Sequence, residues 1–216
     1  MTGHIYTLRT RIQSYQVAFA LIVILIAPSQ AAEFQLLEQG TAVFERVREG
    51  DVQAARELAE LRRQISGQLL GAFRQGVGKL DSNYEGKTHL LLRALQAWRV
   101  REAVPLLAEV IAFRLDKSSF PPYMKYPHTA LYPVAETLVG IGDVAVLKAM
   151  VENIKTHQDP RAHSVSAWVL WKTCGETIAH DILSAEVVRE NDASRKQNLM
   201  RGMKILSKGD GILLEQ

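Results

Sequence analysis

The sequence predicts an all-α protein whose C-terminal part is an array of stacked helical hairpins. Nearly every segment after residue 33 repeats its apolar residues at the helical period, and no run alternates as a strand does. The apolar stripes then recur at spacings of about 30–45 residues, which is typical of helical repeats. The chain of 216 residues holds one cysteine, so no internal disulfide is possible and a packed core must hold the fold.

The first 31 residues have the layout of a secretory signal peptide, residues 1–31. Arg9 and Arg11 form a positive region without an acidic residue, and an eleven-residue apolar run follows and ends before Pro28. Small residues then favour cleavage after Ala31 or Ala32. The run is shorter than the roughly 20 residues that span a bilayer, so cleavage is favoured over retention as an anchor. We therefore expect an exported protein, periplasmic or extracellular, without stable membrane insertion after cleavage.

The charge balance argues against nucleic acid as a partner. The chain has 26 Lys+Arg against 23 Asp+Glu, and Arg9 and Arg11 leave with the signal peptide, so 24 basic residues remain against 23 acidic ones. A net charge this close to zero lacks the basic excess of nucleic-acid-binding domains. We expect a protein partner, no nucleic acid and no cofactor.

Residues 32–83 are predicted to form an N-terminal helical pair. The first helix covers residues 33–48, and the Gly50-Asp51 break makes Asp51 the N-cap of a long second helix from Val52 to about Phe73. The exposed face of that second helix alternates basic and acidic residues, which indicates a solvated, salt-bridged surface. Those residues are Arg56, Glu57, Glu60, Arg62 and Arg63.

Residues 84–207 carry the predicted repeats. A shift of 43 residues places seven apolar positions on apolar positions. The pairs are Leu91 with Val134, Leu95 with Leu138, Trp98 with Ile141, Val104 with Leu147, Leu107 with Met150, Ala108 with Val151 and Ile111 with Ile154. A further shift of 32 residues continues the pattern. It pairs Ala135 with Ala167, Leu138 with Leu170, Val146 with Ile178, Leu147 with Ala179, Met150 with Ile182 and Val151 with Leu183. Residues 193–207 have one apolar and one basic face, as a capping helix requires, and residues 208–216 form a tail.

The glycines of Leu131–Asp143, LYPVAETLVGIGD, could mark a phosphate-binding loop or the corner of a helical hairpin. A phosphate loop follows a strand and has a longer glycine spacing. Here a helical pattern precedes the glycines, and neither a third glycine nor a lysine follows. We therefore expect Gly142 to end one helix in the left-handed conformation and Asp143 to cap the next helix.

Two of these units resemble HEAT repeats. REAVPLLAEVI, residues 101–111, resembles the second helix of a HEAT or HEAT-like repeat, and VAETLVGIGDVAVLKAMVENI, residues 134–154, resembles the pattern around its Gly-Asp corner. The first unit lacks Gly-Asp at its corner and the second lacks the proline; a third unit fits by spacing. The resemblance covers about residues 84–190 and implies a short right-handed α-solenoid that serves as a scaffold for protein contacts. Some members of the family have DNA-repair or lyase activity, but no motif here carries such activity over.

The loop of residues 115–133 breaks the repeat period and is the predicted partner-binding element. It is rich in aromatic residues and stiffened by prolines, which suits binding to another protein. The predicted contact residues are Phe120, Tyr123, Lys125, Tyr126 and His128. The alternative is that the rings fold back and cover the seam between two repeats.

No motif of an enzyme or a metal site is present. The histidines lack the H-E-x-x-H spacing, and no G-x-S-x-G elbow occurs. Cys174 is interpreted as a small apolar residue at a helix end, and no catalytic, cofactor-binding or metal residue is assigned. The sequence therefore favours an exported, non-enzymatic interaction or scaffold module that binds a protein partner through the repeat surface and the 115–133 loop. The alternative is a small hydrolase or lyase built on a helical-repeat scaffold.

Overall fold

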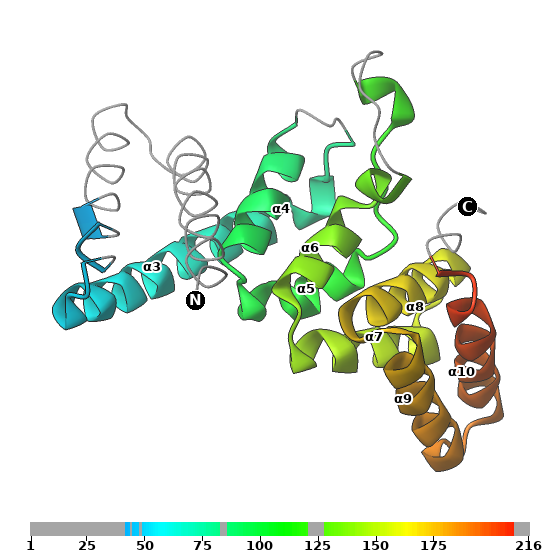
Figure 1. Cartoon of the computed structure of the whole chain (residues 1–216). Helices are drawn as coiled ribbons and strands as arrows, with labels where there is room; N and C mark the ends of the chain where they lie inside the picture. The colour runs from blue at the N-terminus through cyan, green and yellow to red at the C-terminus, as the bar shows by residue number, and fades with distance from the viewer. Residues whose placement is uncertain (1–41, 44, 48, 83–85, 121–127, 210–216) are drawn as a thin grey trace.

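A computed structural model describes residues 42–43, 45–47, 49–82, 86–120 and 128–209. These residues form α-helices and short 3-10 helices, with no strand among them, which confirms the predicted all-α class (Figure 1). The predicted signal peptide and most of the first predicted helix lie outside the described residues. None of the helices described is both long enough and apolar enough to cross a membrane.

Helix α3 (Val52–Gly76) is the long second helix of the predicted N-terminal pair. It begins where the sequence predicts, because the Asp51 carboxylate accepts the N–H groups of Gln53 and Ala54 at 2.8 and 3.1 Å. One stripe of α3 is buried, and it contains Ala54, Ile65, Leu69 and Phe73. A 3-10 turn, η1 (Val77–Lys79), follows α3 and leads towards α4.

Six of the other described helices stack in two rows (Figure 1). In one row α4 (Lys87–Ala97) packs against α6 (Pro133–Ile141), which packs against α8 (Pro160–Cys174). In the other row α5 (Val104–Glu109) packs against α7 (Val144–Thr156), which packs against α10 (Ala193–Leu206). Each row buries an apolar stripe of its helices, so the core is continuous along the molecule.

Side-chain hydrogen bonds join successive helices of the second row in the same way. The Asn153 amide on α7 donates to the Ala108 carbonyl of α5 at 2.7 Å. The Asn198 amide on α10 donates to the Lys155 carbonyl of α7 at 3.1 Å. Both asparagines donate to a carbonyl in the last turn of the helix that precedes theirs in the row. The packing of α10 on α7 therefore resembles the packing of α7 on α5.

The position of α9 (Glu176–Arg189) corrects the predicted third unit. The 32-residue spacing placed α9 beside α7, but α10 occupies that place, and Gly202 of α10 packs between Ile154 of α7 and Leu183 of α9. Ile178, predicted to match the buried Val146, is 55% exposed. The spacing fails here because α9 lacks a single apolar stripe and buries only Ala179 and Leu183, whereas α10 presents Leu199 and Leu206.

Three corners between helices share a left-handed residue. Gly142 has φ 57°, as predicted, and Asp143 caps α7 by accepting the Ala145 N–H at 3.0 Å. Gly175, between α8 and α9, has φ 84°. The corner after α4 has Arg99 at φ 47°, and in the 43-residue alignment Arg99 stands opposite Gly142. Arg99 is the only residue other than glycine with positive φ in the described part of the chain.

Candidate functional site

The base of the predicted binding loop belongs to the core. The Leu115 N–H donates to the Leu131 carbonyl at 2.8 Å and closes the loop, and both side chains are buried. Phe120 follows the 3-10 turn η3 (Lys117–Ser119) and is only 5% exposed. Tyr132 is also buried, with the Arg114 guanidinium 5.8 Å from its ring centre. Phe120 is therefore a correction: it belongs to the buried hydrophobic core, which favours the alternative interpretation, and it is not available to a partner.

The other predicted contact residues are placed differently. Tyr123, Lys125 and Tyr126 lie outside the described residues. His128 is the first residue of the 3-10 turn η4 (His128–Leu131), which leads back to α6. These four residues remain a predicted surface, whereas the structure brings a different set of polar side chains together.

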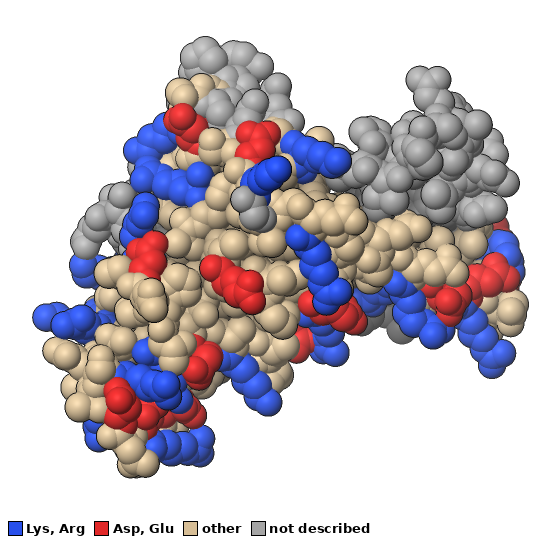
Figure 2. Space-filling view, turned by 180° about the vertical axis from the view of Figure 1, so that it is seen from behind, with Lys and Arg blue, Asp and Glu red and all other residues tan. Residues whose placement is uncertain are grey.

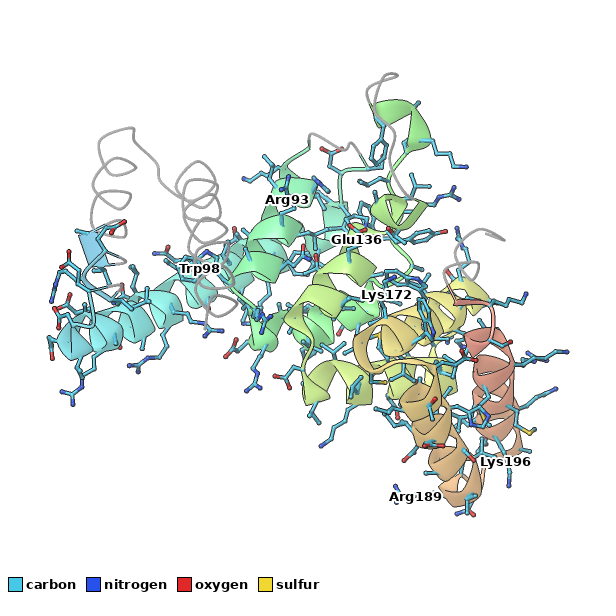
Figure 3. All side chains as sticks on the ribbon, viewed as in Figure 1. Arg93, Trp98, Glu136, Lys172, Arg189 and Lys196 are labelled. Carbon is cyan, nitrogen blue, oxygen red and sulfur yellow. The ribbon has the colours of Figure 1, made fainter. Side chains whose placement is uncertain are left out.

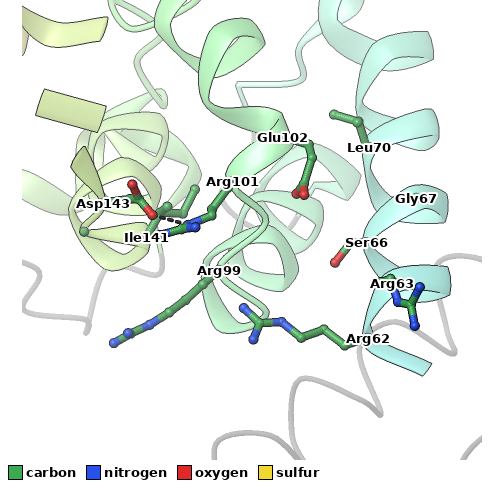
Figure 4. A pocket seen from close by; sticks show the side chains of 11 residues that line it. Arg62, Arg63, Ser66, Gly67, Leu70, Arg99, Arg101, Glu102, Ile141 and Asp143 are labelled. Carbon is green, nitrogen blue, oxygen red and sulfur yellow. Dashed lines mark ion pairs between the residues drawn. The ribbon is translucent and has the colours of Figure 1, made fainter. Parts of the chain in front are cut away.

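A groove of about 630 Å³ lies where α3 passes the first two corners of the repeat array (Figure 4). We call it the arginine groove. It is lined by Arg62, Arg63, Ser66, Gly67 and Leu70 of α3, by Arg99, Arg101 and Glu102 after α4, and by Ile141, Gly142 and Asp143 at the corner between α6 and α7. Its volume lies within the roughly 300–1,000 Å³ that is usual for ligand sites.

Packing of α3 on α4 positions the first wall of the groove. Trp98, the last residue before the corner, is 2% exposed and lies where α4 meets α3 (Figure 3). The Arg62 guanidinium on α3 donates to the Trp98 carbonyl at 3.2 Å. This bond satisfies a carbonyl at the end of α4 and holds the two helices together beside the groove.

Two of the four arginines are neutralised by carboxylates. Arg101 of η2 (Arg101–Ala103) forms an ion pair with Asp143, drawn as a dashed line in Figure 4. Arg63 pairs with Glu60 one turn earlier on α3, with 2.5 Å between the atoms. Within the described residues Arg62 and Arg99 have no carboxylate partner, and Glu102 has no basic one. The groove therefore has an uncompensated pair of guanidinium groups near one end and a carboxylate towards the other (Figure 4).

Arg99 sits in a backbone conformation that glycine normally occupies. The Arg99 N–H donates to the Gln96 carbonyl at 3.0 Å, and the Val100 N–H donates to the Leu95 carbonyl at 3.1 Å. This is the Schellman pattern, in which the left-handed residue is usually glycine. A left-handed residue with a Cβ costs about 1 kcal/mol. The aligned corner of the next unit has glycine, Gly142, so of the two corners that line the groove only the first places a side chain on a left-handed backbone.

The ionisable groups of the groove are suited to binding rather than to proton transfer. The Ala145 N–H, and then the nearby Arg101, hold the pKa of the Asp143 carboxyl below its usual range, although partial burial opposes the shift. Guanidinium groups stay protonated in proteins and carry several fixed donors. The groove can therefore hold an anion by charge and hydrogen bonds.

The cysteine and the possible metal ligands outside the groove do not form a reactive site among the described residues. Cys174 ends α8, as predicted, and its Sγ lies 3.2 Å from the Leu170 carbonyl. Burial raises the pKa of the Cys174 thiol, which disfavours the thiolate. Among the described residues, no group of three His, Cys, Asp or Glu side chains could hold a metal ion.

One feature of the sequence indicates the arginine groove. The first repeat corner lacks the Gly-Asp pair of the second, and Arg99 stands where a glycine is expected. The α3 arginines, however, were interpreted as a salt-bridged surface. That interpretation describes Arg63 correctly, but it misses Arg62, which donates to the carbonyl of Trp98, 36 positions away and directly after α4.

No family model, no curated protein and no solved structure matches the chain. The chemistry of the groove and the arrangement of the helices are therefore the basis for a function.

Proposed function

We propose that this chain is an exported, non-enzymatic interaction module that binds a protein partner on the surface of a short right-handed α-solenoid of HEAT-like hairpins. The two rows of helices support the solenoid, since α4, α6 and α8 stack in order and α5, α7 and α10 stack beside them. An interaction module of this kind needs a rigid surface with a hollow and with unsatisfied binding groups. The arginine groove meets both conditions.

The observation that carries this proposal is the pair Arg62 and Arg99. Both guanidinium groups line a groove of about 630 Å³, and neither faces a carboxylate of the described chain. An exposed arginine without a partner is common by itself, but Arg99 also occupies a strained position. A function for its side chain accounts for the cost of that strain.

The predicted loop surface stays part of the proposal without Phe120. Tyr123, Lys125, Tyr126 and His128 are proposed contacts, while Phe120 is assigned to the core. Replacing Tyr123 and Tyr126 together by alanine should leave the melting temperature unchanged and weaken partner capture.

Affinity capture tests the proposed function. The chain, expressed with its own N-terminal segment and a C-terminal tag, would be captured from cell-envelope extracts, and the bound proteins quantified by mass spectrometry. Three variants are compared with the wild type: Tyr123→Ala/Tyr126→Ala in the loop, Gly67→Leu in the groove, and Gly71→Leu on α3 as the control outside the groove. We expect a partner that the wild type and the control retain and that a loop or groove variant loses.

The proposal fails if all four proteins retain the same set in the same amounts, because neither proposed surface then contributes to capture. No variant may melt below the wild type, so that loss of capture reports the surface and not the fold.

Export is a separate part of the proposal with its own measurement. Mass spectrometry of the protein recovered from the envelope fraction should find an N-terminus at Ala32 or Glu33. Recovery of the intact chain in the cytoplasmic fraction would contradict the proposed signal peptide and leave the binding proposal in place.

A further inference from the structure

We propose that the arginine groove binds a carboxylate-rich peptide segment and that Arg99 is its principal anchor. This inference rests on the proposed function and names the chemistry of the partner segment. It starts from Arg62 of α3 and Arg99 of the corner after α4, which both line the groove and which have no carboxylate partner among the described residues (Figure 4).

Guanidinium groups match carboxylates better than most other ligands. A planar guanidinium donates two parallel N–H bonds to the two oxygens of a carboxylate. Arg62 is held in place by its bond to the Trp98 carbonyl at 3.2 Å, and Arg99 is held by the rigid backbone of the corner. Since both arginines project from fixed points, little backbone order is lost when an anion binds.

The other groups of the groove favour a peptide over a polyanion. Glu102 lines the same groove, so a ligand with uniform negative charge would place charge against a carboxylate. A peptide instead alternates carboxylates with neutral backbone, and its N–H groups can donate to Glu102. Leu70 and Ile141 supply apolar surface for the methylene groups of glutamate side chains.

The charge on the rest of the molecule agrees with a local site. On the face in Figure 2, acidic and basic side chains lie among one another, and no single-sign field covers it. Without the signal peptide the chain has 24 basic residues against 23 acidic ones. Attraction of an anion therefore depends on the groove, and it should weaken with salt because both anchors are exposed.

The position of Arg99 provides a direct test. Glycine is the residue best suited to a left-handed helix end, so Arg99→Gly removes the proposed anchor and relieves the backbone. A purely structural residue would show no effect on ligand binding in this exchange. A binding residue at a strained position should lose affinity while the melting temperature stays the same or rises.

The groove can also be closed without disturbing its charges. Gly67 faces the groove from α3, and a Cβ built there meets nothing within 4 Å. Gly67→Leu fills that space and also replaces glycine in the middle of a helix. Gly71 lies one turn later, outside the groove lining, and a Cβ there also meets nothing within 4 Å. Gly71→Leu is therefore the matched control.

The experiment measures binding of a fluorescein-labelled hexaglutamate peptide to the purified chain by fluorescence anisotropy, at low and at physiological salt. Hexaglutamine and inorganic tripolyphosphate serve as unlabelled competitors. We expect the wild type, Gly71→Leu and Arg74→Gln (an exposed arginine of α3 outside the groove) to bind alike. Arg99→Gly should bind roughly tenfold more weakly or worse, the usual cost of losing a hydrogen bond to a charged group. Gly67→Leu should bind at least as poorly.

Three outcomes would overturn the inference. Hexaglutamate could fail to bind, or could bind Arg99→Gly and Gly67→Leu as well as the wild type, and then the groove is not the site. Tripolyphosphate could displace the labelled hexaglutamate more strongly than unlabelled hexaglutamate, added as a third competitor, and then the ligand is not a carboxylate peptide. None of these results touches the capture experiment, because a partner retained by the wild type and lost from the loop variant would still support the proposed function.

Discussion

At the scale of single residues, backbone conformation and burial decide which side chains can have a function. Arg99 has a strained, left-handed backbone, and its side chain is exposed. Its charge is therefore accessible to a ligand. Phe120 shows the opposite case, since it lies in an irregular segment and is nevertheless buried, close in sequence to Leu115, whose N–H donates to the Leu131 carbonyl. An aromatic residue in a loop is therefore a candidate for partner binding only if its side chain is exposed to solvent.

His89 on α4 gives a prediction about pH. It is 8% exposed, and burial, with a smaller effect of Arg93, lowers the pKa of its imidazole from 6.5 to about 4. Between these values the unfolded chain binds a proton at this site and the folded chain does not. The free energy of unfolding should therefore fall as the pH drops from about 6.5 to about 4, by up to about 3 kcal/mol from this residue.

Denaturant unfolding at pH 7 and pH 4.5 measures this effect. Because carboxylates also titrate in that range, the informative quantity is the difference between wild type and His89→Gln, with the exposed His180→Gln as control. His89→Gln should show the smaller loss on acidification. Equal losses in all three proteins would show that His89 does not carry the effect.

At the scale of elements, the packing of α10 distinguishes this array from a simple run of hairpins. α10 reaches α7 because Gly202 lets the two helices come close: a Cβ at Gly202 would lie 3.0 Å from Ile154 Cγ2 and 3.4 Å from Leu183 Cδ1. The Lys155 ammonium then joins α7 to α9 through Glu186 at 2.6 Å. Both side chains are mostly buried, and the ion pair raises the pKa of Lys155 and lowers that of Glu186.

Two glycine-to-alanine exchanges test this close packing. Gly202→Ala should lower the free energy of unfolding relative to Gly71→Ala by about 1–3 kcal/mol, the usual cost of an overpacked contact. Gly71→Ala should itself stabilise the chain by about 0.5–1 kcal/mol, because alanine replaces glycine in an open part of a helix. Urea unfolding of both variants gives the comparison. Equal stabilities would mean that α10 does not rest against α7 at this point.

The same elements show what sequence can predict here. Caps and corners are local, so Asp51, Gly142 and Asp143 were predicted correctly from a few neighbouring residues. The order in which the helices stack depends on residues far apart in the chain. Asn198 of α10, for example, donates to a carbonyl of α7 that is 43 positions away. The predicted spacing matched α7 with α9, so it could not reveal that α10 packs on α7. The arginine groove was missed for the same reason, since its walls come from three segments of the chain.

At the scale of the whole molecule, the two rows depend on α10 as a cover. Leu199 and Leu206 of α10 are buried, and α10 packs against α7, α8 and α9 and covers surface of these helices that would otherwise meet water. The outer face of α10 is polar, with Arg195, Gln197, Arg201 and Lys204 exposed. Stability of the array is therefore shared between the core of the repeats and their terminal helix.

A shortened chain tests this dependence. A chain that ends after Glu190 lacks α10, so it should expose apolar surface, bind a hydrophobic dye and associate, as seen by light scattering. A chain that ends after Gly209 keeps every described helix and is the control. A monodisperse monomer without dye binding in the shorter chain would show that the two rows stand without α10.

The two asparagine hydrogen bonds also make the two ends of the second row different. Each amide reaches back to the preceding helix, from Asn153 to Ala108 and from Asn198 to Lys155. An added unit would therefore have to extend the stack beyond α10, with its own asparagine directed at the α10 carbonyls. The exposed basic residues of α10 oppose such growth, and changing them to small apolar residues is a route to engineered arrays of greater length.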